Sequence, residues 1–245
     1  MVRHRTRVRR RHLRRGARGR ETRVPRPRLP ETLPGRLLLA CCDIRSNRLD
    51  SRQVVGYLLR AGALTELLLA GRLVDSRGRA SCLRAQATGD PFLDGVLREI
   101  AQERPRAWKA WVRRRPRPAV DEVVGGLEER GYLRRRREFA LGVLPVERVV
   151  VEDGDTVTSL RRRVVEVLTG TEPVERVDAL DAAMVSLLSA GSVTSVVPRR
   201  DKRQHKQRLA ALTERSGEAA PALRTVLADI QVAVATGAAV AVHAS

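Results

Sequence analysis

Leucine and valine recur at intervals of three and four residues along most of the chain after residue 31, and this spacing constrains the fold most strongly. A period near 3.6 puts such residues on one helix face, which must then be buried against other helices. Only six of the 245 residues are aromatic, so the core must be built from Leu, Val and Ala. The sequence therefore predicts a mainly α, single globular helical domain over residues 31–245, with about eight helices.

Turn and capping residues predict where the main helices begin and end. The longest helix is expected to start at Ser51, whose hydroxyl can cap it, and to stop at Gly71. The Asp-Pro pair at 90–91 is typical of another helix start. Two segments break the helical period and predict β-hairpins, a small one near residues 73–83 and an extended one near 132–151.

Both tryptophans fall in a short basic segment, residues 106–115, that predicts a helix stopped by the two prolines that follow it. Trp108 and Trp111 are three residues apart and therefore share one face of that helix. We expect them to lie in the core rather than at a membrane surface. A further helix is expected over residues 119–130.

Positive charge is the second strong feature, because the chain carries a formal net charge of +20. Residues 1–30 hold 13 Arg and one acid. Mutual repulsion and few apolar groups predict that they form a disordered, Arg-rich N-terminal tail. The alternative interpretation is a start-site artefact, in which translation begins upstream of the true start. The rest of the chain is also basic, which favours anionic partners, either nucleic acid or an anionic membrane face.

The residues that would support a metal site, a disulfide framework or catalysis are missing or scattered. Cys41, Cys42 and Cys82 are expected to be small buried groups in a reducing compartment, and the four histidines have no ligand spacing. The chain has neither a phosphate-binding glycine loop nor a nucleophile elbow, and carboxylate pairs such as Glu128 and Glu129 lie among arginines. We expect no enzymatic activity, no cofactor, no metal, no secretory signal and no membrane-spanning helix.

Four short blocks, in the same order and spacing across about residues 31–236, carry a resemblance to a known family. They are residues 59–73, 88–94, 129–133 and 141–145, and they resemble the Golgi phosphoprotein 3 family. The Arg-, Ala- and Val-rich composition resembles that of an actinobacterial member. The resemblance implies a helical domain with a protruding β-hairpin, which acts as a non-enzymatic peripheral membrane protein. It also implies binding of phosphatidylinositol 4-phosphate on the cytosolic face and contact with the tails of glycosyltransferases.

The family's headgroup pocket is retained in part. It uses a tryptophan and an arginine around the long helix, and two arginines before the helix that here ends at Gly131. Arg60 matches the first arginine, and Arg117 lies near one of the later two. Ser51 and Val120 stand about where the tryptophan and the other arginine would be. The resemblance therefore implies that this chain retains two of the four pocket residues. We accordingly expect the protein to recognise mainly negative charge.

The candidate site combines these arginines with the extended hairpin. The headgroup-binding candidates are Arg60, Arg117, Arg134, Arg135, Arg136 and Arg137, and the membrane-inserting candidates at the hairpin tip are Phe139, Leu141, Val143 and Leu144. We expect these arginines, together with Arg113, Arg114 and Arg115, to form one basic face of a cytoplasmic protein that binds the inner face of the membrane. Alternatively, the arginines only solvate their elements and the tip packs onto the domain. Other functions left open are nucleic-acid binding by the tail and a scaffold that docks enzyme tails.

Overall fold

The computed structural model describes residues 29–49, 51–140, 144–217, 228 and 232. Within these residues it contains nine α-helices: α1 (Leu33–Cys41), α2 (Arg52–Leu69), α3 (Pro91–Gln102), α4 (Trp108–Arg113), α5 (Pro116–Glu129), α6 (Gly154–Thr169), α7 (Ala179–Ala190), α8 (Arg199–Gln204) and α9 (Lys206–Gly217). A 3₁₀ turn, η1, spans Val174–Arg176. The prediction of a mainly helical fold is confirmed. Helix α8 is additional, because its sequence RRDKRQ has no apolar spacing to reveal it.

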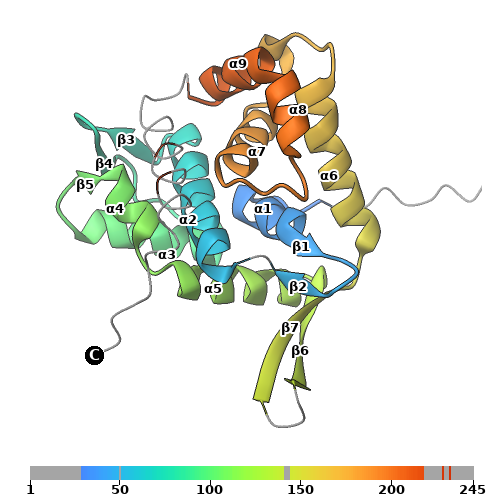
Figure 1. Ribbon diagram of the computed structural model, residues 1–245. Helices are drawn as coiled ribbons and strands as arrows, with labels where there is room; N and C mark the ends of the chain where they lie inside the picture. The colour runs from blue at the N-terminus through green and yellow to red at the C-terminus, as the bar shows by residue number, and fades with distance from the viewer. Residues whose placement is uncertain (1–28, 50, 141–143, 218–227, 229–231, 233–245) are drawn as a thin grey trace, which may run out of the picture.

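Helix α2 forms the centre of the domain (Figure 1). It packs against α1, α3, α4, α5 and α7. Its residues from Val55 to Thr65 are all buried, as expected for a helix covered on every side. Ser51 occupies the position before α2, but its side chain makes no capping hydrogen bond, so that prediction is wrong. The start of α2 is instead fixed by burial and by the Val55 N–H, which donates to the Ser51 carbonyl.

Two other predicted helix boundaries are confirmed in detail. Gly71 adopts φ +64° immediately after Ala70, the residue that caps α2, and glycine tolerates this left-handed conformation. The chain turns there into a strand. Asp90 caps α3, because its carboxylate accepts the N–H groups of Phe92 at 3.0 Å and Leu93 at 3.1 Å. Each of these helix ends is determined by residues within a few positions of it, which is why the sequence predicts them.

The junction between α4 and α5 differs from the prediction. Helix α5 begins at Pro116 rather than at residue 119, because a proline at the first helical position lacks only an N–H that would have no partner there. Residues 106–107 form a strand rather than a helical turn. Trp108 and Trp111 are 1% and 0% exposed, which confirms that both belong to the core.

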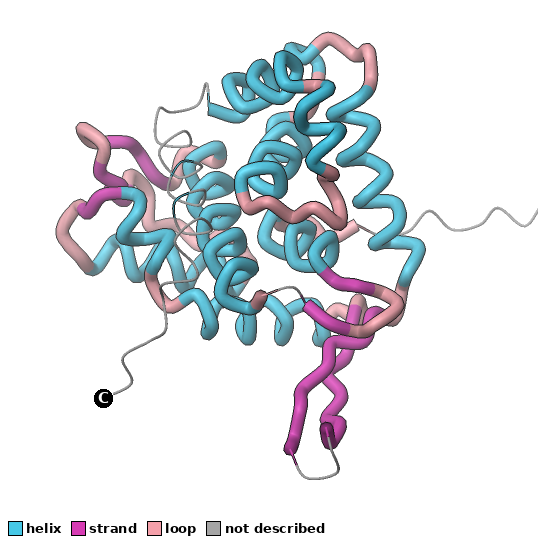
Figure 2. Tube along the Cα trace, in the orientation of Figure 1, coloured by secondary structure: helices cyan, strands magenta, loops and turns pink. Residues whose placement is uncertain are grey.

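Three small antiparallel sheets accompany the helices in the described part of the chain. The strands are β1 (Cys42–Asp43), β2 (Arg48–Leu49), β3 (Leu73–Asp75), β4 (Arg79–Cys82), β5 (Arg106–Ala107), β6 (Leu133–Ala140) and β7 (Leu144–Val151), paired as β1-β2, β3-β4-β5 and β6-β7. Both predicted hairpins are present, and β5 adds a third strand to the smaller one. Strands β6 and β7 pair from Leu133 with Val151 to Ala140 with Leu144, and they project from the helical body (Figure 2).

Several sequence predictions concern other parts of the chain. The Arg-rich tail before residue 29 and most of the apolar stretch after residue 217 lie outside the described residues. Cys41 and Cys42 are buried as predicted, while Cys82 is partly buried. Across the described ranges, no cluster of three or more ligating side chains is suited to a metal ion. In the same ranges, no helix has the length and apolar character that crossing a bilayer requires.

Candidate functional site

The four consecutive arginines Arg134–Arg137 lie along β6, and all four are exposed. Successive side chains of a strand point to opposite faces, so Arg134 and Arg136 share one face while Arg135 and Arg137 share the other. The four arginines are therefore divided between the two faces of the ribbon, and Arg137 lies opposite Glu147 in the ladder.

Acidic residues hold the first two of these arginines at the base of the hairpin. Arg134 Nε lies 2.6 Å from Glu152 Oε1, and Arg135 Nε lies 2.9 Å from Glu128 Oε2. The Arg135 backbone N–H also donates to Glu128 at 2.8 Å. These hydrogen bonds from Arg135 lower the pKa of Glu128 from its ordinary value. The Arg135–Glu128 pair fastens β6 to the end of α5. Arg136 and Arg137 lie further along β6, nearer the tip.

The predicted inserting residues fall at the far end of this hairpin. Phe139 pairs with Pro145 and Ala140 pairs with Leu144, which are the last two pairs of the ladder. Leu141 and Val143 lie outside the described residues. The backbone thus places Phe139 and Leu144 next to the tip, and membrane insertion stays a prediction for all four residues.

Arg60 lies inside the protein rather than on its surface. The residue is 2% exposed, its Nε donates to the Trp111 carbonyl at 3.1 Å, and its Nη2 donates to Glu99 Oε2 at 2.9 Å. Burial lowers the pKa of Arg60 from its ordinary value, and the charge of Glu99 opposes that shift. The guanidinium keeps its proton at physiological pH. A headgroup would have to displace Glu99 to reach it.

Glu99 gathers two further arginines from the α4–α5 junction. Arg114 Nε lies 3.5 Å from Glu99 Oε2, and Arg115 Nη1 lies 3.7 Å from Glu99 Oε1. The Arg114 guanidinium also stacks over the Trp111 ring at 5.3 Å and pairs with Glu103. We name Arg60, Glu99, Arg114 and Arg115 the Glu99 cluster. Sequence reasoning did not identify Glu99, because its partners lie 39, 15 and 16 positions away in the chain.

The structure divides the predicted basic face into two groups. Arg117 is exposed in the first turn of α5, two residues after Arg115 of the Glu99 cluster. The hairpin arginines are attached at the other end of α5, through Glu128. A helix of this length spans about 20 Å. Arg60 and Arg117 therefore lie together at one end of α5, apart from the arginines of β6.

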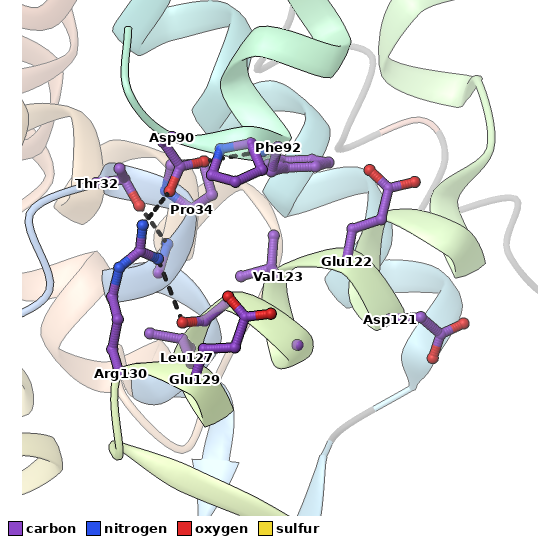
Figure 3. A pocket seen from close by; sticks show the side chains of 14 residues that line it. Thr32, Pro34, Asp90, Phe92, Asp121, Glu122, Val123, Leu127, Glu129 and Arg130 are labelled. Atoms are coloured by element: carbon purple, nitrogen blue, oxygen red, sulfur yellow. Dashed lines mark hydrogen bonds and ion pairs between the residues drawn. The ribbon is translucent and has the colours of Figure 1, made fainter.

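A pocket of about 220 Å³ lies between α1, α3 and α5, and four of its lining residues are acidic while one is basic (Figure 3). Asp121, Glu122 and Glu129 reach it from α5, and Asp90 reaches it from the start of α3. The only basic lining residue is Arg130, which is bound to Asp90 at 3.2 Å and to the Gly126 carbonyl at 3.3 Å. The negative charge of the four carboxylates makes this pocket unsuitable for a phosphate group.

Glu66 lines a neighbouring cavity of about 390 Å³ that shares Asp90 and Arg130 with the first. Its Oε2 accepts the Leu33 N–H at 2.7 Å, which joins α2 to the start of α1. Burial is the main cause that raises the pKa of Glu66, and the nearby charge of Asp90 adds to it. The ionised form is therefore less favourable in the folded protein than in the unfolded chain.

Glu66→Gln is expected to raise the stability of the folded protein at neutral pH. The folded-state pKa is raised, so the folded protein binds more protons than the unfolded chain between pH 4.5 and the raised pKa. The contribution of Glu66 to stability consequently falls as pH increases through that window. Glutamine keeps the acceptor for Leu33 without the charge. Urea unfolding should show a gain at pH 7 that shrinks towards pH 4; an equal gain at both pH values would contradict this account.

Comparison with known families gives one match. The model of the family described as Golgi phosphoprotein 3 (GPP34) matches residues 33–230. No match to a curated protein was found. The matched stretch covers most of the chain and includes both the Glu99 cluster and the β6–β7 hairpin.

Proposed function

The chain belongs to the Golgi phosphoprotein 3 (GPP34) family, and on this premise we propose that it is a peripheral protein that binds anionic phospholipid surfaces through its β6–β7 hairpin. The family is known for binding phosphatidylinositol 4-phosphate at membranes, and its members are generally non-enzymatic adaptors. We place the protein at the cytoplasmic, inner face of the membrane, where anionic lipids create a negative surface potential.

The observation that carries this proposal is the position of four exposed arginines on a projecting ribbon (Figure 1). Each basic side chain near an anionic leaflet contributes about 1 kcal/mol, and the contribution falls with salt. Arg136 and Arg137, nearer the tip, would approach the lipid first, followed by Arg134 and Arg135 at the base. Such binding is reversible and needs no membrane-spanning anchor.

Two finer properties stay predictions. Selectivity for the phosphatidylinositol 4-phosphate headgroup is implied by the family, while Ser51 and Val120 replace two of the four pocket residues in this chain. Docking of the tails of membrane enzymes is implied in the same way. Both concern what the protein recognises once it lies at the membrane. Vesicles of equal surface charge but different headgroups therefore distinguish attraction to charge from recognition of a headgroup.

Flotation of the full chain on lipid vesicles tests the proposal. Three vesicle types are compared: neutral phosphatidylcholine, and phosphatidylcholine with either phosphatidylserine or phosphatidylinositol 4-phosphate at equal surface charge. We expect flotation with both anionic vesicles, none with neutral vesicles, and release at high salt, where screening shortens the reach of the charges. Equal flotation on neutral and anionic vesicles, or on neither, would refute the proposal. Stronger flotation on the phosphoinositide would establish headgroup selectivity.

A further inference from the structure

Residues 199–208, which form α8 and the start of α9, contain six basic residues and one acid. Two of the six have a structural role. Lys202 Nζ donates to the Ser189 carbonyl at 2.9 Å, and Arg208 Nε donates to the Val167 carbonyl at 2.7 Å. Both carbonyls lie in the last turn of a helix, α7 or α6, where a cation is favourable. These two contacts attach α8 and α9 to the helical body.

The other four basic residues are exposed, and we name them the α8 surface: Arg199, Arg200, Arg203 and Lys206. The three arginines are three or four positions apart, so they share one face of α8, and Lys206 adds a charge where α9 begins. Among the described residues, none of the four forms an ion pair, and the acid within the segment, Asp201, pairs with none of them. The α8 surface therefore carries four positive charges that these acids do not neutralise.

Helix α6 separates the α8 surface from the membrane-binding hairpin. Strand β7 ends at Val151 and α6 begins at Gly154, while Arg208 attaches the start of α9 to the last turn of α6. A helix of 16 residues is about 24 Å long. Figure 1 shows α8 and α9 at one end of the domain and the hairpin at the other. Since this separation exceeds the Debye length of about 8 Å, the two groups of charges act on different partners.

The spacing of the α8 surface matches a linear polyanion. Its four charges lie within eight residues of nearly continuous helix, which is a length of about 10 Å. One strand of a nucleic-acid duplex carries a phosphate about every 3.4 Å along the axis, so the two charge densities are similar. None of the six aromatic residues falls between positions 199 and 217, so this segment offers contacts to phosphates rather than stacking on bases.

A flat bilayer matches the same end of the molecule less well. Glu172 and Glu175 are exposed beside α9, because Arg208 Nη1 donates to the Glu172 carbonyl at 2.7 Å and η1 packs against that helix. An anionic plane that covered this end would approach these two carboxylates as well as the basic side chains. A linear polyanion that lies along α8 avoids them.

We propose that the α8 surface binds the phosphate backbone of a nucleic acid without reading its sequence. The guanidinium groups and the Lys206 ammonium donate charge-assisted hydrogen bonds to phosphate oxygens, and the counterions that they displace drive the association. This inference goes beyond the proposed membrane function and does not depend on it. Because the hairpin lies at the opposite end, the protein can hold a nucleic acid while it is bound to a membrane.

Fluorescence anisotropy of a labelled DNA duplex, titrated with the full chain at several salt concentrations, tests the proposal. The α8 variant carries glutamine at all four positions, and its affinity at low salt should be at least about tenfold lower. The slope of log affinity against log salt should become smaller by about 3–4, since each lost phosphate contact removes about 0.9. The arginines of residues 1–30 are the same in every variant and contribute equally.

The matched control carries glutamine at three arginines and one lysine that are also exposed and, within the described part of the chain, form no ion pair, but that are scattered around the β3-β4-β5 sheet and α4: Arg79, Arg84, Arg104 and Lys109. Its net charge equals that of the α8 variant, and its salt slope should change by less than about 1. Equal changes in the two variants would overturn the proposal, because total charge would then explain the binding.

A conservative variant separates charge from folding. Lysine in place of Arg199, Arg200 and Arg203 keeps every charge, so the salt slope should stay within about 1 of the value for the unsubstituted chain. The α8 variant should also keep its melting temperature, because glutamine is a good helix former and no ion pair to a described residue is lost. A reduced slope in the lysine variant would overturn the proposal, since the arginines would then act through the fold.

Other polyanions identify the partner. An RNA duplex of the same length that binds as tightly as DNA would support recognition of the shared backbone, and a preference for either duplex would identify the source. Polyglutamate of equal charge that binds as tightly, with the same loss in the α8 variant, would overturn the proposal in favour of an acidic protein. Loss of vesicle flotation by the α8 variant would overturn it in favour of a lipid contact. The titration needs no membrane, so a chain that fails to float refutes the hairpin proposal without deciding this one.

Discussion

Substituting serine for Arg134, Arg136 and Arg137 together is expected to reduce the affinity of the full chain for anionic vesicles about 100-fold. Each of these exposed arginines contributes about 1 kcal/mol beside an anionic leaflet, and three such contributions amount to about two factors of ten. Arg135 is left in place because its contacts with Glu128 at 2.8 and 2.9 Å fasten the hairpin to α5. The dependence of flotation on salt should become weaker in the variant, since fewer charges face the lipid.

A matched variant separates the hairpin from the net charge of the protein. Arg79, Arg84 and Arg104 are exposed residues in or near the β3-β4-β5 sheet, and serine at all three makes the same change in charge. Figure 1 shows this sheet beside α4, away from the projecting hairpin. The control variant should retain its vesicle affinity within about threefold, as expected for rim charges that mainly steer association. Equal losses in the two variants would show that total charge, rather than the hairpin, determines binding.

Local signals account for the parts of the fold that the sequence predicts well. The Asp90 cap, the left-handed Gly71 and the break of helical period before β6 each depend on a few neighbouring residues. Trp108 and Trp111 share a helix face by spacing alone, and an apolar face of that size is buried by default. The hairpin was predictable for the same reason, because its two strands adjoin in sequence and pair without a long connection.

The Glu99 cluster was not predictable, because its geometry depends on how α2, α3 and the α4–α5 junction pack together. In the sequence, Arg60 is one arginine among many and Glu99 is one acid on the polar side of α3. Packing directs Arg60 into the protein, where its Nη2 donates to Glu99 Oε2 at 2.9 Å. The same packing places the hairpin at the opposite end of α5 from Arg117, so a single basic face does not form. An arrangement that depends on packing between distant segments produces no periodic pattern in the sequence.

Close contact between α2 and α5 produces the largest expected effect on stability. Gly56 lies on α2, and a methyl group there would overlap the carbonyl of Pro116 and come within 2.8 Å of its Cα. These are backbone atoms at the first helical position of α5, so only a movement of the helix can relieve the clash. We expect Gly56→Ala to lower the free energy of unfolding by about 3 kcal/mol, at the upper end of the usual cost of overpacking.

Gly95 on α3 supplies the matched control, because a methyl group at that position meets nothing within 4 Å. Gly95→Ala should therefore raise the free energy of unfolding by about 0.5–1 kcal/mol, the ordinary gain when alanine replaces glycine within a helix. Urea unfolding of the two variants separates packing from helix propensity, because both variants gain the same helix propensity when alanine replaces glycine. A shift of α5 in Gly56→Ala would also move Arg115, which lies one residue before Pro116, away from Glu99. Equal stability of the two variants would contradict the close approach of α2 and α5 on which the position of the arginine cluster depends.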